Sequence, residues 1–274
     1  MKRLINIMPA KPASWLLGAI PILMVVIVYL GFSNARLAEN PHDRLLPSIP
    51  TMESSIERLA TQENVRTGEV TLWADTEASL KRLIFGVAIS ALVGLCVGML
   101  CGAMPLVGSF FSPLVTLISL VPPLAILPIL FIAFGTEELS KVMLIVIGVC
   151  PCIIRDLQNQ AERMPREQLI KAQTLGAGSW QIMIRVLLPQ LLPRLIQSIR
   201  LLLGSAWLFL IAAEAIAAQN GLGYRIFLYQ RYLAMDIILP YVAWITLLAF
   251  VMDRVLVALS RLLFPWYSAS GGNP

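Results

Sequence analysis

Apolar residues are concentrated in six long stretches of the chain, and polar segments separate these stretches. A helix needs roughly 20 mostly apolar residues to cross a bilayer, and the stretches are close to this length or longer. The pattern therefore predicts an all-α membrane protein with about six transmembrane helices. Their predicted bounds are residues 15–32, 80–104, 113–134, 139–154, 191–218 and 237–263.

The composition supports a membrane protein. Of the 274 residues, 58% are hydrophobic and only 14% are charged, whereas soluble domains carry about 25% charged residues. So few charges cannot cover a water-exposed surface, and the apolar side chains must face lipid. The net charge of +5 is typical of basic cytoplasmic loops. No dense basic run with interleaved aromatic residues indicates nucleic-acid binding.

The charges between the apolar stretches predict the side of the membrane on which each segment lies, because Lys and Arg accumulate on the cytoplasmic side. Residues 1–14 form a basic, cytoplasmic N-terminal tail, and residues 264–274 form a cytoplasmic C-terminal tail. Residues 33–78 are net acidic and are predicted to form a periplasmic loop. Within this loop, residues 52–62 are predicted to form a short amphipathic helix on the membrane surface. The basic loop 155–190 is predicted to be cytoplasmic.

The first apolar stretch has two interpretations. Ser33-Asn34-Ala35 loosely resembles the small-residue site at which a signal peptide is cleaved. The stretch is long for a signal peptide, however, and further apolar stretches follow it. A retained first transmembrane helix is therefore preferred.

Glycines punctuate the second stretch, at Gly86, Gly94, Gly98 and Gly102. Small residues let helix backbones approach closely in lipid. We expect these glycines to form a packing face for another helix rather than a site for a solute.

The third stretch contains Pro122, Pro123 and Pro128. An interior proline removes a helix hydrogen bond and kinks the axis, and lipid cannot satisfy the freed carbonyl groups. A kinked span that lines a solute path and a kinked helix without solute contact both fit this pattern. Glu214 in the fifth stretch is a second candidate for the path, because charges inside a membrane are often functional. It could lie at the outer gate, or its carboxylate could bond to a neighbouring loop or helix end.

The sequence predicts neither a catalytic set nor a cofactor or metal bound by this chain. All four cysteines lie in apolar stretches, which argues against a disulfide framework. Cys150 and Cys152 are expected to pack at a helix end rather than to bind a soft metal. His42 is the only histidine, and no GxxxxGK(S/T) loop is present. If transport is driven by ATP, another subunit must hydrolyse it.

The most specific pattern lies in the basic loop. Residues 169–180 read LIKAQTLGAGSW, and Pro189 precedes the fifth span. Glycine tolerates unusual dihedral angles and ends helices readily. The segment therefore predicts two short helices broken at Gly176 to Gly178. Such a unit can pack into a groove of a partner protein and pass rigid-body motion to the spanning helices.

This loop resembles the EAA loop of type I ABC import permeases. Gly176 matches the family's glycine, and Val186, Leu188 and Pro189 match its end. Residues 170–172 read Ile-Lys-Ala where Glu-Ala-Ala is expected. Other segments resemble the nitrate/taurine/aliphatic-sulfonate permeases over roughly residues 70–265, namely residues 121–128, 134–135, 212–214 and 221–224.

The resemblance implies a type I ABC importer permease fold over residues 79–263, with five helices and a cytoplasmic coupling helix. It implies a homodimer in the bacterial inner membrane, two ATPase subunits that carry ATP and Mg²⁺, and a periplasmic or lipid-anchored binding protein. The solute is expected to be small and polar, like taurine, a sulfonate or nitrate. The residues expected to couple to the ATPase are Ala172, Leu175, Gly176, Ala177, Gly178, Ser179, Trp180 and Pro189. Those expected along the path or gate are Pro122, Pro123, Pro128 and Glu214.

Two other classes of membrane protein are the alternatives. A secondary transporter or channel is expected to show an intramembrane charge relay or an inverted repeat, and the sequence displays neither. A membrane-bound enzyme needs polar groups that converge at one depth, whereas the charges here are scattered.

Overall fold

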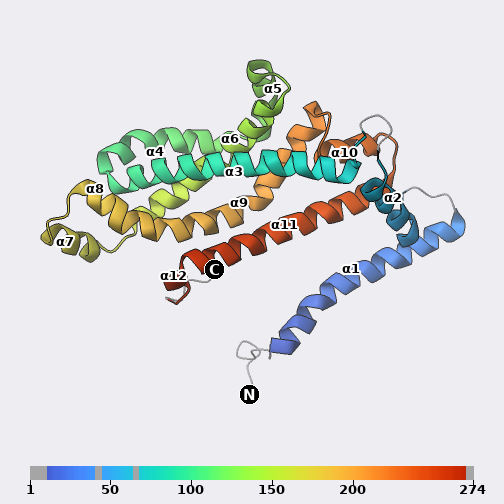
Figure 1. The fold of residues 1–274 in the computed structure, drawn as a ribbon, viewed down its shortest axis with the longest axis horizontal. Coiled ribbons are helices and arrows are strands. Elements are labelled where there is room, and N and C mark those ends of the chain that lie inside the picture. The colour runs from blue at the N-terminus through green and yellow to red at the C-terminus, as the bar shows by residue number, and fades with distance from the viewer. Residues whose placement is uncertain (1–10, 41–44, 64–67, 270–274) are drawn as a thin grey trace.

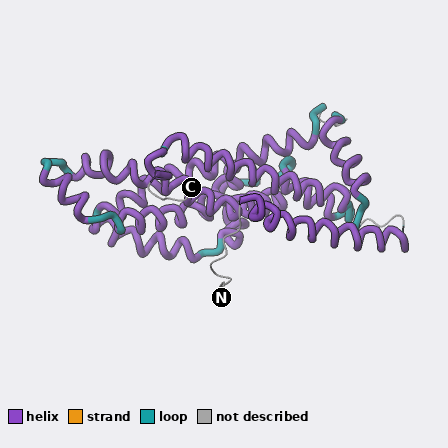
Figure 2. Tube along the Cα trace, turned by 90° about the horizontal axis from the view of Figure 1, so that it is seen from below, coloured by secondary structure: helices purple, strands orange, loops and turns teal. Residues whose placement is uncertain are grey.

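The protein is a bundle of helices in a computed structural model that describes residues 11–40, 45–63 and 68–269. Within these residues the only strand-like pairing is an isolated bridge between Glu63 and Val70, so the predicted all-α fold is confirmed (Figure 2). Most of the predicted tail 1–14, and His42, lie outside the described residues. The helices are α1 (Lys11–Glu39), α2 (Ile49–Thr61), α3 (Thr71–Ala103), α4 (Pro105–Leu120), α5 (Pro123–Phe134), α6 (Glu138–Glu162), α7 (Arg166–Thr174), α8 (Ser179–Ile182), a π-helix (Met183–Leu187), α9 (Leu188–Ala217), α10 (Leu222–Gln230), α11 (Met235–Leu263) and α12 (Pro265–Ala269).

Four helical segments of the described chain are long and apolar enough to cross a membrane: Leu16–Ala38, Thr71–Ala103, Ser179–Ile216 and Met235–Leu263. A fifth results if α4 and α5 are counted as one span. The predicted span 139–154 falls in α6, which is not among them. Its 25 residues are nevertheless about 38 Å long, enough to cross the hydrocarbon layer. About six spans were predicted, and length and composition identify four or five.

The segment predicted as one kinked span over residues 113–134 is broken rather than kinked. The chain forms two helices there, α4 and α5, whose axes differ by 96°. Pro122 and Pro123 are adjacent, so two successive residues lack an N–H, and each proline keeps the residue before it out of the helical region. Val121 and Pro122 accordingly have ψ values of 125° and 117°. The helix breaks where a single proline would only bend it, and α5 projects from the bundle (Figure 1).

The expected glycine packing face of α3 is confirmed, and its partner is α6. A Cβ added to Gly86 would lie 2.8 Å from Ile145, and one added to Gly94 would lie 2.5 Å from Ile153. Ile145 and Ile153 are both fully buried. α3 and α6 therefore lie in close backbone contact, and α6 is enclosed by α3, α4, α5 and α9.

Replacing Gly94 with valine is expected to separate α3 from α6, because the added atoms have no free volume. Overpacking of this kind costs about 1–3 kcal/mol, so the thermal unfolding temperature of the detergent-solubilised protein should fall. Gly204→Val is the matched control, since no atom lies within 4 Å of an added Cβ at this helical glycine. Equal unfolding temperatures for the two variants would contradict the packing.

The amphipathic helix predicted over residues 52–62 is confirmed as α2, which begins three residues earlier. Ser48 caps it by accepting a hydrogen bond from the Thr51 N–H. α2 packs on α11 and α3, and the Ser55 hydroxyl donates to Asp236 over 2.7 Å. The predicted loop 33–78 is thus largely helical, since α1 extends past residue 32 and α3 begins at residue 71.

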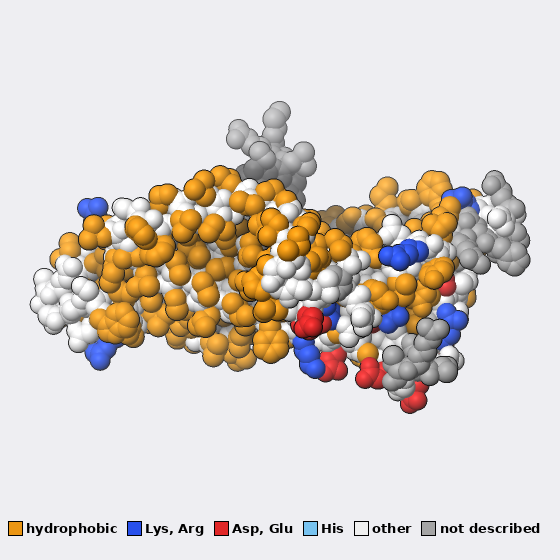
Figure 3. Space-filling view, turned by 90° about the horizontal axis from the view of Figure 1, so that it is seen from above, with side chains coloured by type: hydrophobic (Ala, Val, Ile, Leu, Met, Phe, Trp, Pro, Cys, Tyr) orange, Lys and Arg blue, Asp and Glu red, His pale blue; other side chains and the backbone are white. Residues whose placement is uncertain are grey.

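The charged residues are distributed unevenly along the long axis of the molecule. α7 and α8 lie at one end, and α2 and α10 lie at the other (Figure 1). On the face seen in Figure 3, hydrophobic side chains cover the middle, acidic and basic side chains mix toward the α10 end, and the charged side chains seen at the α7 end are Lys and Arg. This distribution agrees with the predicted cytoplasmic position of the basic loop.

Candidate functional site

The first candidate site is the tip, defined here as residues 166–182 with α7, the turn 175–178 and α8. No side chain of α7 or α8 is buried. Leu175 is 88% exposed and Trp180 is 64% exposed. A soluble surface rarely leaves large apolar side chains this open at a projecting end, and exposed apolar patches often mark interaction sites. The tip has the chemistry of a surface that a partner covers.

The shape of the tip depends on Gly176. Its φ is +81°, a conformation that is costly for residues with a Cβ. The Gly176 N–H donates to the Gln173 carbonyl over 2.9 Å, and the Ala177 N–H donates to the Ala172 carbonyl over 3.0 Å. These two bonds form a Schellman motif, which ends α7 and reverses the chain. The predicted break between two short helices at Gly176 to Gly178 is therefore confirmed.

The tip is joined to α9 without a loop. Pro189 has no N–H to donate to the carbonyl four residues earlier, and the Leu188 N–H instead bonds the Met183 carbonyl, five residues earlier. The resulting π-helix keeps α8 and α9 in one continuous segment, Ser179–Ile216, of 38 residues. α9 begins at Leu188 rather than at the predicted residue 191, and it is continuous with the tip.

Two further contacts attach the tip to the bundle. Met183 and Leu187 of the π-helix are buried, and the Gln190 side chain donates to Gln168 of α7 over 2.9 Å. Displacement of the tip must therefore move the base of α9. Ala172, Ala177 and Pro189 are half-buried, whereas Leu175, Gly176, Gly178, Ser179 and Trp180 are exposed.

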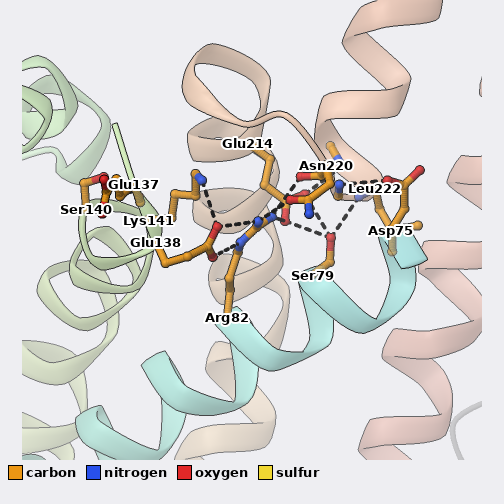
Figure 4. Close-up of polar contacts among 12 residues, drawn as sticks. Asp75, Ser79, Arg82, Glu137, Glu138, Ser140, Lys141, Glu214, Asn220 and Leu222 are labelled. Carbon is orange, nitrogen blue, oxygen red and sulfur yellow. Dashed lines mark hydrogen bonds and ion pairs between the residues drawn. The ribbon is translucent and has the colours of Figure 1, made fainter. Parts of the chain in front are cut away.

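The second candidate site is a charge network near the α10 end, formed by Asp75, Ser79, Arg82, Glu138, Lys141, Glu214, Asn220 and Arg225 (Figure 4). Arg82 is at its centre and is 3% exposed. Its guanidinium donates to Glu138 over 2.5 and 2.7 Å, to Glu214 over 2.7 Å, and to the side chain of Asn220 over 2.6 Å. Arg82 thereby connects α3, α6, α9 and the turn before α10.

Glu214 is fully buried, and three donors surround it. Besides Arg82, the Ser79 hydroxyl lies 2.8 and 3.0 Å from its two oxygens, and the Gly223 N–H donates over 2.8 Å. The carboxylate thus bonds to α3 and to the start of α10, and a bond to a helix end was the second interpretation of this residue. Its oxygens are occupied by protein groups in this conformation.

Asp75 bonds to the turn before α10 and to α10 itself. Its carboxylate accepts from the Gly221 N–H over 2.9 Å and from Arg225 over 2.7 Å. Asp75 is 1% exposed, so its charge is stabilised by these donors rather than by water. The three carboxylates Asp75, Glu138 and Glu214 match the three cations Arg82, Lys141 and Arg225, and the network is neutral as a whole.

The four residues expected along the path or gate do not converge. Pro122 and Pro123 lie at the break between α4 and α5, and Pro128 lies inside α5. Pro122 and Pro128 are exposed, whereas Glu214 is enclosed. α5 does approach Glu214 indirectly, because Leu127 and Leu130 pack against its neighbour Ala213.

The sequence interpretation missed Asp75, Ser79 and Arg82. Asp75 falls in the predicted loop 33–78, although it lies in the first turns of α3. Arg82 falls inside the predicted second span, and a cation at that position is a signal that a buried partner such as Glu214 should exist. Among the described residues, no group of three or more His, Cys, Asp or Glu is arranged to hold a metal ion, and the four cysteines are free.

Comparison with known proteins identifies relatives over most of the chain. A family model described as binding-protein-dependent transport system inner membrane component matches residues 94–267. The taurine transport system permease protein TauC of Escherichia coli (strain K12) is 36% identical over 199 residues, which cover 73% of this chain and 72% of TauC. The bicarbonate transport system permease protein CmpB of Synechocystis sp. is 29% identical over 197 residues, covering 71% and 70%. A chain from an inward-facing structure of the MetNI methionine ABC transporter has the same fold, with a TM-score of 0.61, 20% identity, and coverage of 79% of this chain and 99% of that one.

Proposed function

This chain belongs to the family of binding-protein-dependent transport system inner membrane components, the permease subunits of ABC importers, and from that premise we propose that two copies of it form the path for a small solute with an acidic head group. The proposal places the homodimer in the cytoplasmic membrane of a bacterium. Two ATPase subunits bind on the inside, and a periplasmic or lipid-anchored binding protein delivers the solute from the outside. ATP and Mg²⁺ are bound by the ATPase subunits.

The exposed tip is the observation that carries this proposal. Leu175 and Trp180 are exposed on the tip, within the basic loop 155–190. A partner that receives these apolar side chains in a groove gains the energy of burying them. In importers of this family, the ATPase subunit is the partner expected at this position.

The connection between tip and α9 supports rigid coupling. When the two ATPase subunits close, the two tips approach each other, and α9 moves with its tip because the helix is continuous through Ser179–Ile216. The far end of α9 carries Glu214, which is bonded to α3 and to the start of α10. Motion at the tip is thus passed to the opposite side of the bundle, where the path opens to the binding protein.

The solute class follows from what the relatives are named for. Taurine carries a sulfonate, and bicarbonate is itself a small oxyanion. We infer a solute that shares this feature: a compact molecule with an acidic group that presents several oxygens. The binding protein makes the finer selection among such molecules.

Reconstitution of the chain into vesicles tests the proposal. Together with its ATPase and its binding protein, the chain should accumulate a radiolabelled taurine or bicarbonate probe only when ATP is present on the ATPase side. Omitting the ATPase should abolish accumulation. Full uptake without the ATPase would contradict the proposal and favour a secondary transporter or channel. Failure of the ATPase to co-purify with the chain would equally contradict it.

A further inference from the structure

A groove of about 770 Å³ lies between α4 and α6, apart from the charge network. The end of α3, hydroxyl groups of α4 and two polar side chains of α6 line it, including Ser109, Ser112, Thr116, Gln158 and Glu162. Glu162 is the one charged residue of this lining, and its carboxylate accepts a hydrogen bond from Gln158. α4 starts directly after α3 ends, near the tip (Figure 1). The groove therefore opens at the end of the bundle that the tip occupies.

The polar residues of α4 form one stripe. Ser109, Ser112, Thr116 and Ser119 are spaced by three, four and three residues, so they share a face of the helix. Another face of α4 carries large exposed apolar side chains, with Leu106 87%, Phe110 75% and Leu117 64% exposed. The apolar face is suited to contact with lipid, whereas the hydroxyl stripe requires polar surroundings.

α6 presents a matching stripe. Arg155, Gln158 and Glu162 follow the same spacing of three and four residues. The two stripes meet, because Gln158 donates to Ser112 over 2.9 Å and Arg155 donates to Ser119 over 3.1 Å. The α4 stripe is about 15 Å long, half the thickness of the hydrocarbon layer, and it leads from the tip end to the break between α4 and α5.

Part of this polar surface has no protein partner. Within the described residues, the hydroxyls of Ser109 and Thr116 form no hydrogen bond, and both residues are exposed. Arg155 forms no ion pair there either, since the neighbouring Asp156 is bound to Arg194 of α9. Arg155 follows directly after the predicted span 139–154, so its exposed guanidinium faces water or an anion rather than lipid.

We propose that the groove and the two stripes that continue from it toward Ser119 form the inner part of the solute path, and that Arg155, one turn of α6 beyond the groove, attracts the acidic head group of the solute. The hydroxyls of Ser109 and Thr116 supply further donors, whereas the Ser119 hydroxyl donates to the Thr116 carbonyl. A guanidinium suits a head group with several oxygens because its N–H groups form a planar fork. This inference rests on the proposed function, since it assigns a route and a selectivity residue to the permease.

Thiol labelling of the assembled transporter in inside-out vesicles tests the groove without knowledge of the solute. In a background with the four native cysteines replaced by alanine, Thr116→Cys is labelled with 2-sulfonatoethyl methanethiosulfonate, which is anionic, or with its trimethylammonium analogue, which is cationic. Leu117→Cys on the apolar face is the matched control. We expect Thr116→Cys to react at least about tenfold faster than Leu117→Cys, because the thiolate forms only in water.

Arg155→Gln then tests the role of the charge. The ratio of the anionic to the cationic labelling rate at Thr116→Cys should fall about fivefold or more, as expected for the loss of a nearby cation in a hydrated site, and Arg155→Lys should retain most of the ratio. Arg254→Gln on α11, where Arg254 is paired with Asp253, should leave it unchanged.

Three results would overturn the inference: equal rates for Thr116→Cys and Leu117→Cys, a rate ratio that does not respond to Arg155→Gln, or an equal response to Arg254→Gln. Slow labelling at Thr116→Cys would mean that the stripes serve only to join helices or that a second copy covers them. Co-purification of the ATPase is measured on the same samples. Its loss contradicts the proposed function, whereas labelling reports on the groove alone.

Discussion

Trp180→Asp is expected to abolish ATP-driven uptake while the protein still inserts and folds. Trp180 is 64% exposed at the tip and supports no part of the bundle core. In the assembled importer its indole is expected to lie in a groove of the ATPase, where a carboxylate would be desolvated without a partner. Large aromatic anchors of this kind contribute roughly 2 kcal/mol or more, so uptake should fall at least about 30-fold.

Uptake of a taurine or bicarbonate probe into vesicles measures the effect, and co-purification of the ATPase shows whether binding or only coupling is lost. Trp180→Phe is the control, because it keeps an apolar ring at the same position and should retain most activity. Membrane amounts and unfolding temperatures of both variants should equal those of the parent. Uptake at the parent rate by Trp180→Asp would contradict the assignment of the tip as the coupling surface.

Arg82→Leu is expected to produce the largest loss of stability in the chain. Leucine removes every donor that Arg82 directs to Glu138, Glu214 and Asn220, and Glu214 is left fully buried with a charge that only Ser79 and Gly223 contact. Removing one partner of a buried ion pair costs about 3–5 kcal/mol. The unfolding midpoint of the solubilised protein should fall accordingly.

Lys81→Leu provides a matched control for Arg82→Leu at the adjacent position. Lys81 pairs with Glu77 on the surface, where both side chains are 66% exposed, and such pairs contribute about 0–1 kcal/mol. The double variant Arg82→Leu with Glu214→Leu should recover part of the stability, because the unpaired buried charge is gone. Similar midpoints for Arg82→Leu and Lys81→Leu would contradict the structural role of the network.

Features that depend on local sequence were predictable. Lipid selects long apolar helices, and the four apolar segments that pass as spans all overlap predicted ones. Gly176 predicted the break between α7 and α8, because a positive φ and a Schellman motif are encoded within a few residues. The glycines of α3 likewise indicated a close contact with another helix, but they did not indicate that this helix would be α6.

Features that depend on distant residues were not predictable. Ser79 and Glu214 are 135 residues apart, and Asp75 and Arg225 are 150 residues apart, so no pattern along the chain connects them. The direction of α5 was also missed. Prolines indicate where a helix weakens, but the 96° angle also depends on the packing of Leu127 and Leu130 against α6 and α9.

The π-helix between Met183 and Leu187 has a consequence for the orientation of the tip. Each residue of an α-helix advances the side-chain direction by about 100°, and a π-turn accommodates one residue more than an α-turn does. This surplus residue sets the angular phase between α8 and α9, independently of which face α9 turns to its neighbours. Gain or loss of a single residue here during evolution would therefore turn Trp180 to a different direction, toward a differently shaped ATPase. The transmembrane packing of the rest of the helix would stay unchanged.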